Sequence, residues 1–157
     1  MSLYLAIKAF HVLAAVVLVG AGIGCAFFLH FASRADAAGR LREQAAARAL
    51  ACRVAVQADL GLALPAGIAT PASGFVLLKL GGWPFDAPWV AASLALYALA
   101  TCLALPAFVL HARLAKAAAA GQASDEAWRR DARRWGRLAL PLFAALAAVV
   151  VLMTAKP

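Results

Sequence analysis

The chain has 157 residues, of which 66% are hydrophobic and 14% are charged, and its mean hydropathy is +0.85. A soluble domain carries about 45–50% apolar residues, and one of this length buries only about 70% of its surface. It could not hide this apolar excess from water, so the composition excludes an ordinary soluble domain and favours a chain dissolved in a lipid bilayer.

Charged residues divide the chain into four apolar segments. Each is close to the roughly 20 residues with which a helix crosses about 30 Å of hydrocarbon. The sequence therefore predicts an all-α integral membrane protein with a single domain over residues 1–157, folded as a four-helix bundle. The expected spans are Leu3 to Phe31, Val54 to Leu80, Trp89 to Leu110 and Leu138 to Ala155.

The net charge of +8 comes from two basic loops, at residues 32–53 and 111–137, which hold twelve of the fifteen lysines and arginines. The turn between the second and third spans holds none. Because cytoplasmic loops of membrane proteins are enriched in Lys and Arg, we expect both loops in the cytoplasm and both termini outside. The charge is thus a signal of topology, and no nucleic-acid partner is predicted.

The second basic loop contains a helical pattern of its own. Ser124 is expected to cap a helix that has two acidic residues in its first turn. Trp128, Ala132 and Trp135 then share one face, with arginines around the remainder. This pattern is typical of a helix lying in the membrane interface, so we expect Trp128 to Arg137 to contact anionic lipid headgroups. A surface that docks a partner protein is the alternative.

The second span carries Pro65 and Pro71, each of which lacks an N–H and crowds the carbonyl four residues earlier. We therefore expect a kinked or locally opened helix. In a membrane such breaks persist where neighbouring helices or a polar cavity satisfy the freed backbone groups, so the kink marks either a binding site or a packing bend. The Ala-rich stretch from Leu41 to Arg53 is expected to extend this helix into the cytoplasm.

Ionisable side chains inside a span are costly, so each is a candidate functional residue. His11 lies about 12 Å along the first span and shares a helical face with Tyr4 and Lys8. Its imidazole is either a ligand for haem iron or a metal, or a structural group bonded to a carbonyl or to Ser93. Met153 in the fourth span is a candidate for a further haem ligand.

Asp59 lies about 8 Å from the cytoplasmic end of the second span. Its carboxylate either pairs with an arginine or forms a structural hydrogen bond, or it relays protons or faces a ligand in the kinked cavity. His11 and Asp59 fall in opposite leaflets, so we expect them to mark two ends of a polar path.

His30 and His111 both end spans at the inner surface. A bis-histidine site is geometrically allowed there, but half-solvated interface residues are the favoured interpretation.

The remaining motifs are simpler. Cys25, Cys52 and Cys102 are widely spaced, so we interpret them as reduced small side chains and predict no metal site. The Gly-x-x-x-Gly spacing from Gly20 to Gly24 allows close packing within the bundle, against a second copy or in a larger membrane complex. No phosphate loop, zinc-protease motif, paired carboxylates or serine triad occurs, so hydrolytic and phosphoryl chemistry have no support.

Several motifs in fixed order resemble one known family. They are Tyr4 to His11, Gly20 to Phe28, Ala58-Asp59, Pro71 to Gly74, Pro88 to Tyr97, Leu105-Pro106 and Met153 to Pro157. On these motifs the chain resembles a bacterial family of predicted integral membrane proteins, family twenty-two sixty-nine of the domains of unknown function. The resemblance implies the four-span fold in a bacterial inner membrane but no established activity. It would carry over Lys8, His11, Asp59, Pro71, Gly74, Trp89, Tyr97 and Pro106, whereas His30, Ala104 and His111 depart from the pattern.

Two more distant likenesses point to cofactor chemistry. The segment from Ile7 to Val12 is similar to the first helix of HemJ-type protoporphyrinogen oxidases, and the four-helix layout resembles the CopD membrane domain of copper resistance. These likenesses imply haem or copper handling centred on His11.

Our leading hypothesis is therefore a membrane protein that binds haem b for redox or porphyrin handling. His11 would be an axial ligand, Lys8 and Tyr4 would lie beside it with Lys8 at a propionate, and Asp59 would shuttle protons. One alternative is a transport or binding module for a small solute or metal ion, gated at the break from Pro65 to Pro71. Another is a non-catalytic accessory subunit of a larger membrane complex.

Overall fold

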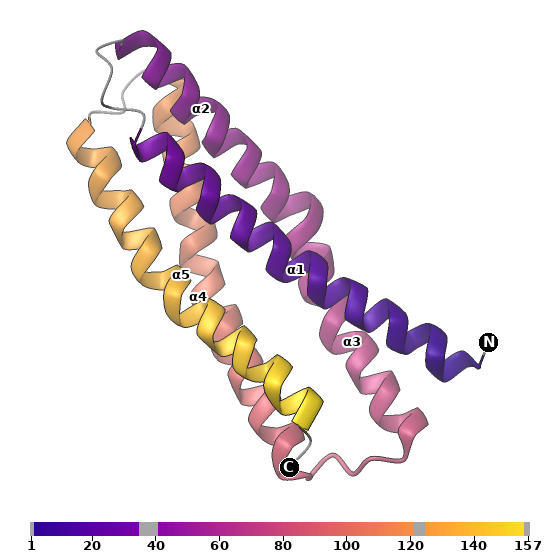
Figure 1. The fold of residues 1–157 in the computed structure, drawn as a ribbon. Helices are drawn as coiled ribbons and strands as arrows, with labels where there is room; N and C mark the ends of the chain where they lie inside the picture. The colour runs from indigo at the N-terminus through magenta and orange to yellow at the C-terminus, as the bar shows by residue number, and fades with distance from the viewer. Residues whose placement is uncertain (1, 35–40, 121–124, 156–157) are drawn as a thin grey trace.

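The computed structural model describes residues 2–34, 41–120 and 125–155, which are helical almost throughout (Figure 1). No strand occurs in these three ranges, so the predicted all-α class is confirmed. Two helices and a short π-helix between them form one continuous rod, and each of the other three helices is a rod by itself. The elements are α1 (Leu3–Arg34), α2 (Leu41–Ala58), η2 (Asp59–Ala63), α3 (Leu64–Gly81), α4 (Pro88–Ala119) and α5 (Asp125–Ala155).

Within the described residues, four helical segments are long and apolar enough to cross a membrane. They contain every span expected from the sequence. Large apolar side chains such as Leu13, Ile23 and Leu105 point outward from the rods. An apolar outer surface is stable against lipid tails and unstable against water. The segments are Leu3–Phe31, Ala46–Gly81, Pro88–Ala119 and Glu126–Ala155.

The rods pack antiparallel. α1 lies against α2 and α3, and α4 lies against α5 and α2. The start of α1, the end of α5 and the turn between α3 and α4 lie at one end of the rods, as an even number of passes requires (Figure 1). The opposite end is where the two basic loops are attached, and we call it the basic end. That the basic end faces the cytoplasm stays a prediction.

The predicted interfacial helix is not a separate element. α5 begins at Asp125 and continues without interruption to Ala155, so this segment is the first part of the fourth rod. Trp128 and Trp135 are only 1% and 9% exposed because their shared face packs inside the protein. The interpretation of this face as one that rests on the membrane was therefore wrong. Ser124 lies outside the described residues.

A buried cluster at the basic end joins all four rods. Above it, the guanidinium carbon of Arg48 on α2 lies 5.5 Å from the centre of the Trp128 ring, a cation–π contact that buries the arginine stem. α2 runs from Leu41 to Ala58 and leads directly into η2, which confirms that the Leu41 to Arg53 stretch continues the second helix. The members of the cluster are Leu29, Ala51, Cys52, Ala107, Leu114, Trp128, Trp135 and Ala139.

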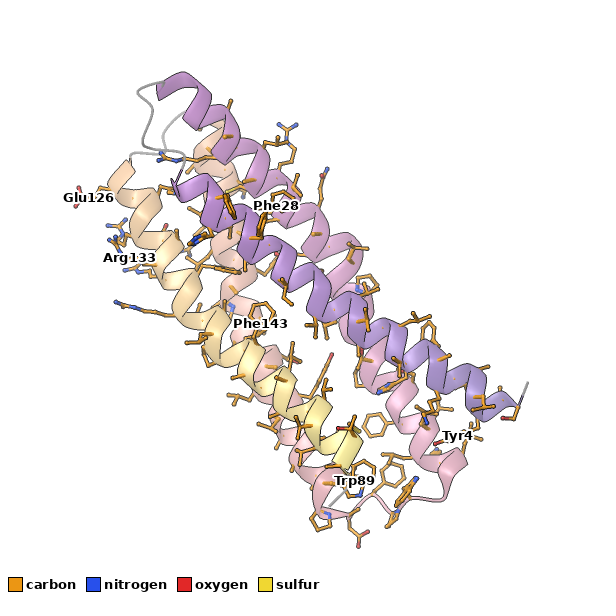
Figure 2. All side chains as sticks on the ribbon, in the orientation of Figure 1. Tyr4, Phe28, Trp89, Glu126, Arg133 and Phe143 are labelled. Atoms are coloured by element: carbon orange, nitrogen blue, oxygen red, sulfur yellow. The ribbon has the colours of Figure 1, made fainter. Side chains whose placement is uncertain are left out.

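The glycine of α1 that packs closely inside the chain is Gly22, whereas the prediction named Gly20 and Gly24. A Cβ placed on Gly22 would lie 2.8 Å from Cζ of Phe143, whose ring points from α5 toward α1 (Figure 2). Nothing described lies within 4 Å of such an atom at Gly20 or Gly24. Close packing inside the chain therefore depends on Gly22, and contact of the Gly20 to Gly24 face with a second copy stays a prediction.

Candidate functional site

The rod formed by α2, η2 and α3 is interrupted at Asp59. The N–H of Leu64 bonds to the carbonyl of Asp59, five residues earlier, instead of to the fourth residue back. Pro65 follows and has no N–H to continue the pattern. The resulting π-turn adds one residue to the helix, a feature found often at functional sites. The predicted local opening is thus confirmed for the turn before Pro65, whereas α3 continues as a regular helix through Pro71.

Asp59, at the start of this turn, bonds to His111 on α4. Nδ1 of His111 lies 2.5 Å from Oδ2 of Asp59. The histidine side chain is 3% exposed and the carboxylate 19% exposed. When the carboxylate is ionised it only accepts, and Nδ1–H of the imidazole is the donor; when it is protonated, its O–H donates to Nδ1. The expectation that His111 is half-solvated was wrong. Among the alternatives left open for Asp59, the described residues show a hydrogen bond, and its partner is a histidine on α4.

Two further side chains, Cys25 and Trp135, contact the pair. Sγ of Cys25 on α1 lies 4.0 Å from Oδ1 of Asp59 and 3.8 Å from the carbonyl of Ala55. The His111 ring stacks on the Trp135 ring, with centroids 5.2 Å apart and planes 25° from parallel. Nε2 of His111 is buried and has no hydrogen-bond partner in the described part of the chain. The pair is therefore enclosed by protein but keeps one free ring nitrogen.

The pair lies near one boundary of the hydrocarbon layer. At about 1.5 Å per residue, its rod rises about 33 Å from Asp59 to its end at Gly81, and α4 rises about 35 Å from Pro88 to His111. Both distances are close to the hydrocarbon thickness of about 30 Å. The carboxylate and imidazole are thus within a short distance of water at the basic end.

A neighbouring helix supplies the hydrogen bond that Pro71, the second proline of the rod, cannot donate. Pro71 cannot donate to the carbonyl of Gly67, four residues earlier. Tyr97 on α4 instead donates its hydroxyl hydrogen to that carbonyl at 2.5 Å. This bond satisfies a backbone group that lipid could not, as we expected for a break inside a membrane.

His11 forms a second polar site, in the other half of the rods. Its Nδ1 lies 2.9 Å from Oγ of Ser73 on α3, and the ring also interacts with the backbone of Thr70. The Ser73 hydroxyl donates to the carbonyl of Ala69 at 2.6 Å, so its oxygen accepts from Nδ1–H of a neutral ring. Nε2 then carries the lone pair. A Cβ at Gly74 would lie 3.3 Å from the ring, so the glycine makes room for it.

The remaining candidates are placed as follows. Ser93, one of the alternatives left open as a partner of His11, is buried, and its hydroxyl has no partner among the described residues, so this alternative was wrong. Lys8 is exposed and Tyr4 is half-buried, and neither shares a hydrogen bond with His11 in the described part of the chain. Met153 packs against Leu78 and Trp89.

No bis-histidine site is formed. His30 is exposed and meets Phe31 edge to face, whereas His111 is buried beside Asp59. Across residues 2–34, 41–120 and 125–155 there is no group of three or more His, Cys, Asp or Glu side chains that could hold a metal ion.

The pairing of Asp59 with His111 was missed at the sequence level, although a signal for it exists. Both residues lie near the basic ends of antiparallel spans, so they occupy the same depth. Depth alone does not say which faces meet, however, and the π-turn changes the face on which Asp59 lies. Ser73 and Tyr97 were missed as hydrogen-bond partners for the same reason.

These features define a multi-span α-helical membrane protein with two histidine sites at different depths. Residues 5–157 match the family described as predicted integral membrane protein, domain of unknown function 2269, and the chain belongs to this family. The predicted family is thereby confirmed. No curated protein and no solved structure matches the chain. The likeness to HemJ-type oxidases and to CopD stays a hypothesis.

Proposed function

We propose that this protein transfers protons in the bacterial inner membrane, with Asp59 and His111 as the proton-exchanging pair. The observation that carries the proposal is the 2.5 Å bond between a carboxylate in a membrane span and an imidazole that is almost completely buried. Apolar side chains of similar volume would pack there without the cost of removing a charge from water. Stability therefore gives no reason for the pair, and proton exchange does.

The geometry supports a simple transfer. His111 donates Nδ1–H to Oδ2 of Asp59, and Nε2 has no partner within the described residues. A proton that arrives at Nε2 allows Nδ1 to release its own proton to Oδ2. The products are a neutral carboxylic acid and an imidazole protonated at Nε2, so one proton enters and none is lost. The reverse step restores the starting state.

We infer the direction of access from the basic loops. If these loops are cytoplasmic, the pair exchanges protons with the cytoplasm, and the exposed arginines of α5 face anionic headgroups. The polar groups on α3 continue toward the other surface, first the Gly67 carbonyl with Tyr97 and then Ser73 with His11. These groups support a path that begins at Asp59 and ends at His11.

Proton flux into proteoliposomes tests the proposal. A potassium diffusion potential would drive protons, and a trapped pH-sensitive dye would report them. We expect flux with the unchanged chain and at least a tenfold loss in Asp59→Asn and His111→Gln, because neither amide takes up a proton. Asp131→Asn, the same substitution at a partly buried carboxylate of α5 outside the pair, is the matched control. Flux equal to that of empty vesicles would contradict the proposal, and flux that needs an added solute or ion would assign the pair to coupled transport.

A second candidate function is haem b binding at His11, and the Ser73 contact favours it. Ligand histidines usually donate their other ring N–H to a neighbouring acceptor, which fixes the tautomer, and Nδ1 of His11 has this arrangement with Ser73. Nε2 would hold the iron, with Lys8 and Tyr4 toward the propionates, and a bound haem would supply one-electron redox chemistry.

The reduced-minus-oxidised absorption spectrum of the purified protein tests this candidate. We expect Soret and alpha bands that disappear in His11→Ala and remain in His30→Ala, a substitution of an exposed histidine on the same helix. A featureless spectrum after expression with added haem precursor would reject haem binding. That result would leave the proton-transfer proposal intact, because Asp59 and His111 do not touch His11.

A further inference from the structure

We propose that a groove between α4 and α5 binds one anionic phospholipid, with its phosphate against arginines and an acyl chain against the apolar wall. The groove has a volume of about 540 Å³. Its apolar part is formed by Pro106, Val109 and Leu138, and its basic part by Arg113, Arg134 and Arg137. A phospholipid has the same division into an apolar and an anionic part.

The position of the groove along the membrane normal matches the position of a lipid molecule. At about 1.5 Å per residue, Pro106 lies about 27 Å and Arg113 about 38 Å along α4 from its first residue, Pro88. The first position lies inside a hydrocarbon layer of about 30 Å, and the second lies in the headgroup layer of a bilayer about 40–45 Å thick in total. The apolar wall is thus at the depth of acyl chains and the arginines are at the depth of phosphates.

The charges of the groove favour phosphate. Three arginines from two helices line the groove, and guanidinium binds phosphate oxygens through paired N–H donors. Oδ1 of Asp131 lies 3.6 Å from Arg134 of the groove and 3.7 Å from Arg130 outside it. It offsets one of the three positive charges at most. Basic sites between helices at this depth are typical binding sites for anionic headgroups.

The apolar wall distinguishes a lipid from free phosphate, which would gain nothing from Pro106 and Val109. The proposal is also more specific than general contact of basic residues with a membrane surface, since it assigns one lipid to one place. It does not depend on the proton-transfer proposal, because no residue of this groove belongs to the Asp59 and His111 pair.

Native mass spectrometry of the full chain in detergent, titrated with dioleoyl phosphatidylglycerol, tests the inference. Each basic residue near an anionic surface contributes a free energy equivalent to about a fivefold change in affinity. We expect Arg113→Gln with Arg137→Gln to weaken binding about 25-fold. The control, Arg130→Gln with Arg133→Gln, makes the same charge change on exposed positions outside the groove and should change binding less than threefold. Arg133 points away from the other helices (Figure 2).

Two further measurements test whether the apolar wall contributes to binding and whether the ligand is a lipid or free phosphate. Val109→Trp fills the apolar part without a change of charge, so it should weaken lipid binding by at least fivefold. Inorganic phosphate at millimolar concentration should not displace the lipid, and dioleoyl phosphatidylcholine should bind at least tenfold more weakly. Equal losses in the two arginine pairs, displacement by phosphate, or no effect of Val109→Trp in protein of unchanged helicity would overturn the inference.

Discussion

The Tyr97 hydroxyl replaces the hydrogen bond that Pro71 removes from the carbonyl of Gly67, and this substitution can be tested by a double-mutant cycle. A buried carbonyl without a donor costs about 1–3 kcal/mol, whereas side-chain bonds between membrane helices average about 0.6 and reach about 1.7 kcal/mol. The bond is short, at 2.5 Å, and the carbonyl has lost its helical donor. We therefore expect Tyr97→Phe to lower the free energy of unfolding by about 1.5 kcal/mol, roughly a tenfold change in the folding constant.

The same substitution should cost much less once the backbone donor is restored. In Pro71→Ala the N–H at position 71 can reach the Gly67 carbonyl, so Tyr97→Phe should then cost about 0.5 kcal/mol. The coupling energy between the two positions is thus about 1 kcal/mol. The cycle cancels the separate effect of Pro71→Ala on helix stability.

Unfolding of the four proteins by titration with sodium dodecyl sulfate in mixed micelles, followed by circular dichroism, gives these free energies. Tyr4→Phe is the matched control, because this half-buried tyrosine makes no hydrogen bond in the described part of the chain. Equal costs of Tyr97→Phe with and without Pro71, or a cost no larger than that of Tyr4→Phe, would refute the reasoning.

Three other predictions follow from packing and charge. Alanine at Gly20, Gly74 and Gly22 should lower the free energy of unfolding increasingly in that order, with about 1–2 kcal/mol between the first and the last in the same assay. The reason is that a new Cβ has nothing within 4 Å at Gly20, lies 3.3 Å from the His11 ring at Gly74 and lies 2.8 Å from the Phe143 ring at Gly22. The reverse order would contradict the described packing. Arg48→Ala should cost about 1–2 kcal/mol more than Arg53→Ala on the same helix, because Arg48 is buried over an indole ring and Arg53 is exposed; equal thermal midpoints would show that the contact adds nothing. Alkaline phosphatase fused after the last residue should be active and a cytoplasmic reporter fused there inactive, and the opposite pattern would reverse the proposed topology.

The helical framework was predictable because membrane spans depend on length and apolar composition. Pro65 also indicated where the second span opens, since its missing N–H interrupts the hydrogen bonding of the preceding turn. The prediction divided α5 into a surface helix and a membrane span, because the sequence changes from charged to apolar near Leu138. A helix continues across such a change whenever its apolar face, here that of Trp128 and Trp135, packs against neighbouring rods.

Side-chain partners were less predictable because they depend on how the helices are rotated. His11 was placed correctly among the inward-facing residues of α1, but its partner on α3 is Ser73, not Ser93 of α4. Asp59 and His111 were both placed near the basic ends of their spans, where the structure has them. Their pairing also required the additional residue of the π-turn, and periodicity alone does not contain that information.

Infrared difference spectroscopy most directly tests whether Asp59 and His111 exchange a proton. The purified protein in lipid would be titrated from alkaline to acidic pH while the carbonyl stretch of protonated carboxylic acids is recorded. We expect one such band to disappear in Asp59→Asn, to shift in His111→Gln and to remain unchanged in Asp131→Asn. A spectrum in which no band depends on Asp59 at any pH would show that this carboxylate does not take up a proton, and would contradict the proposed function.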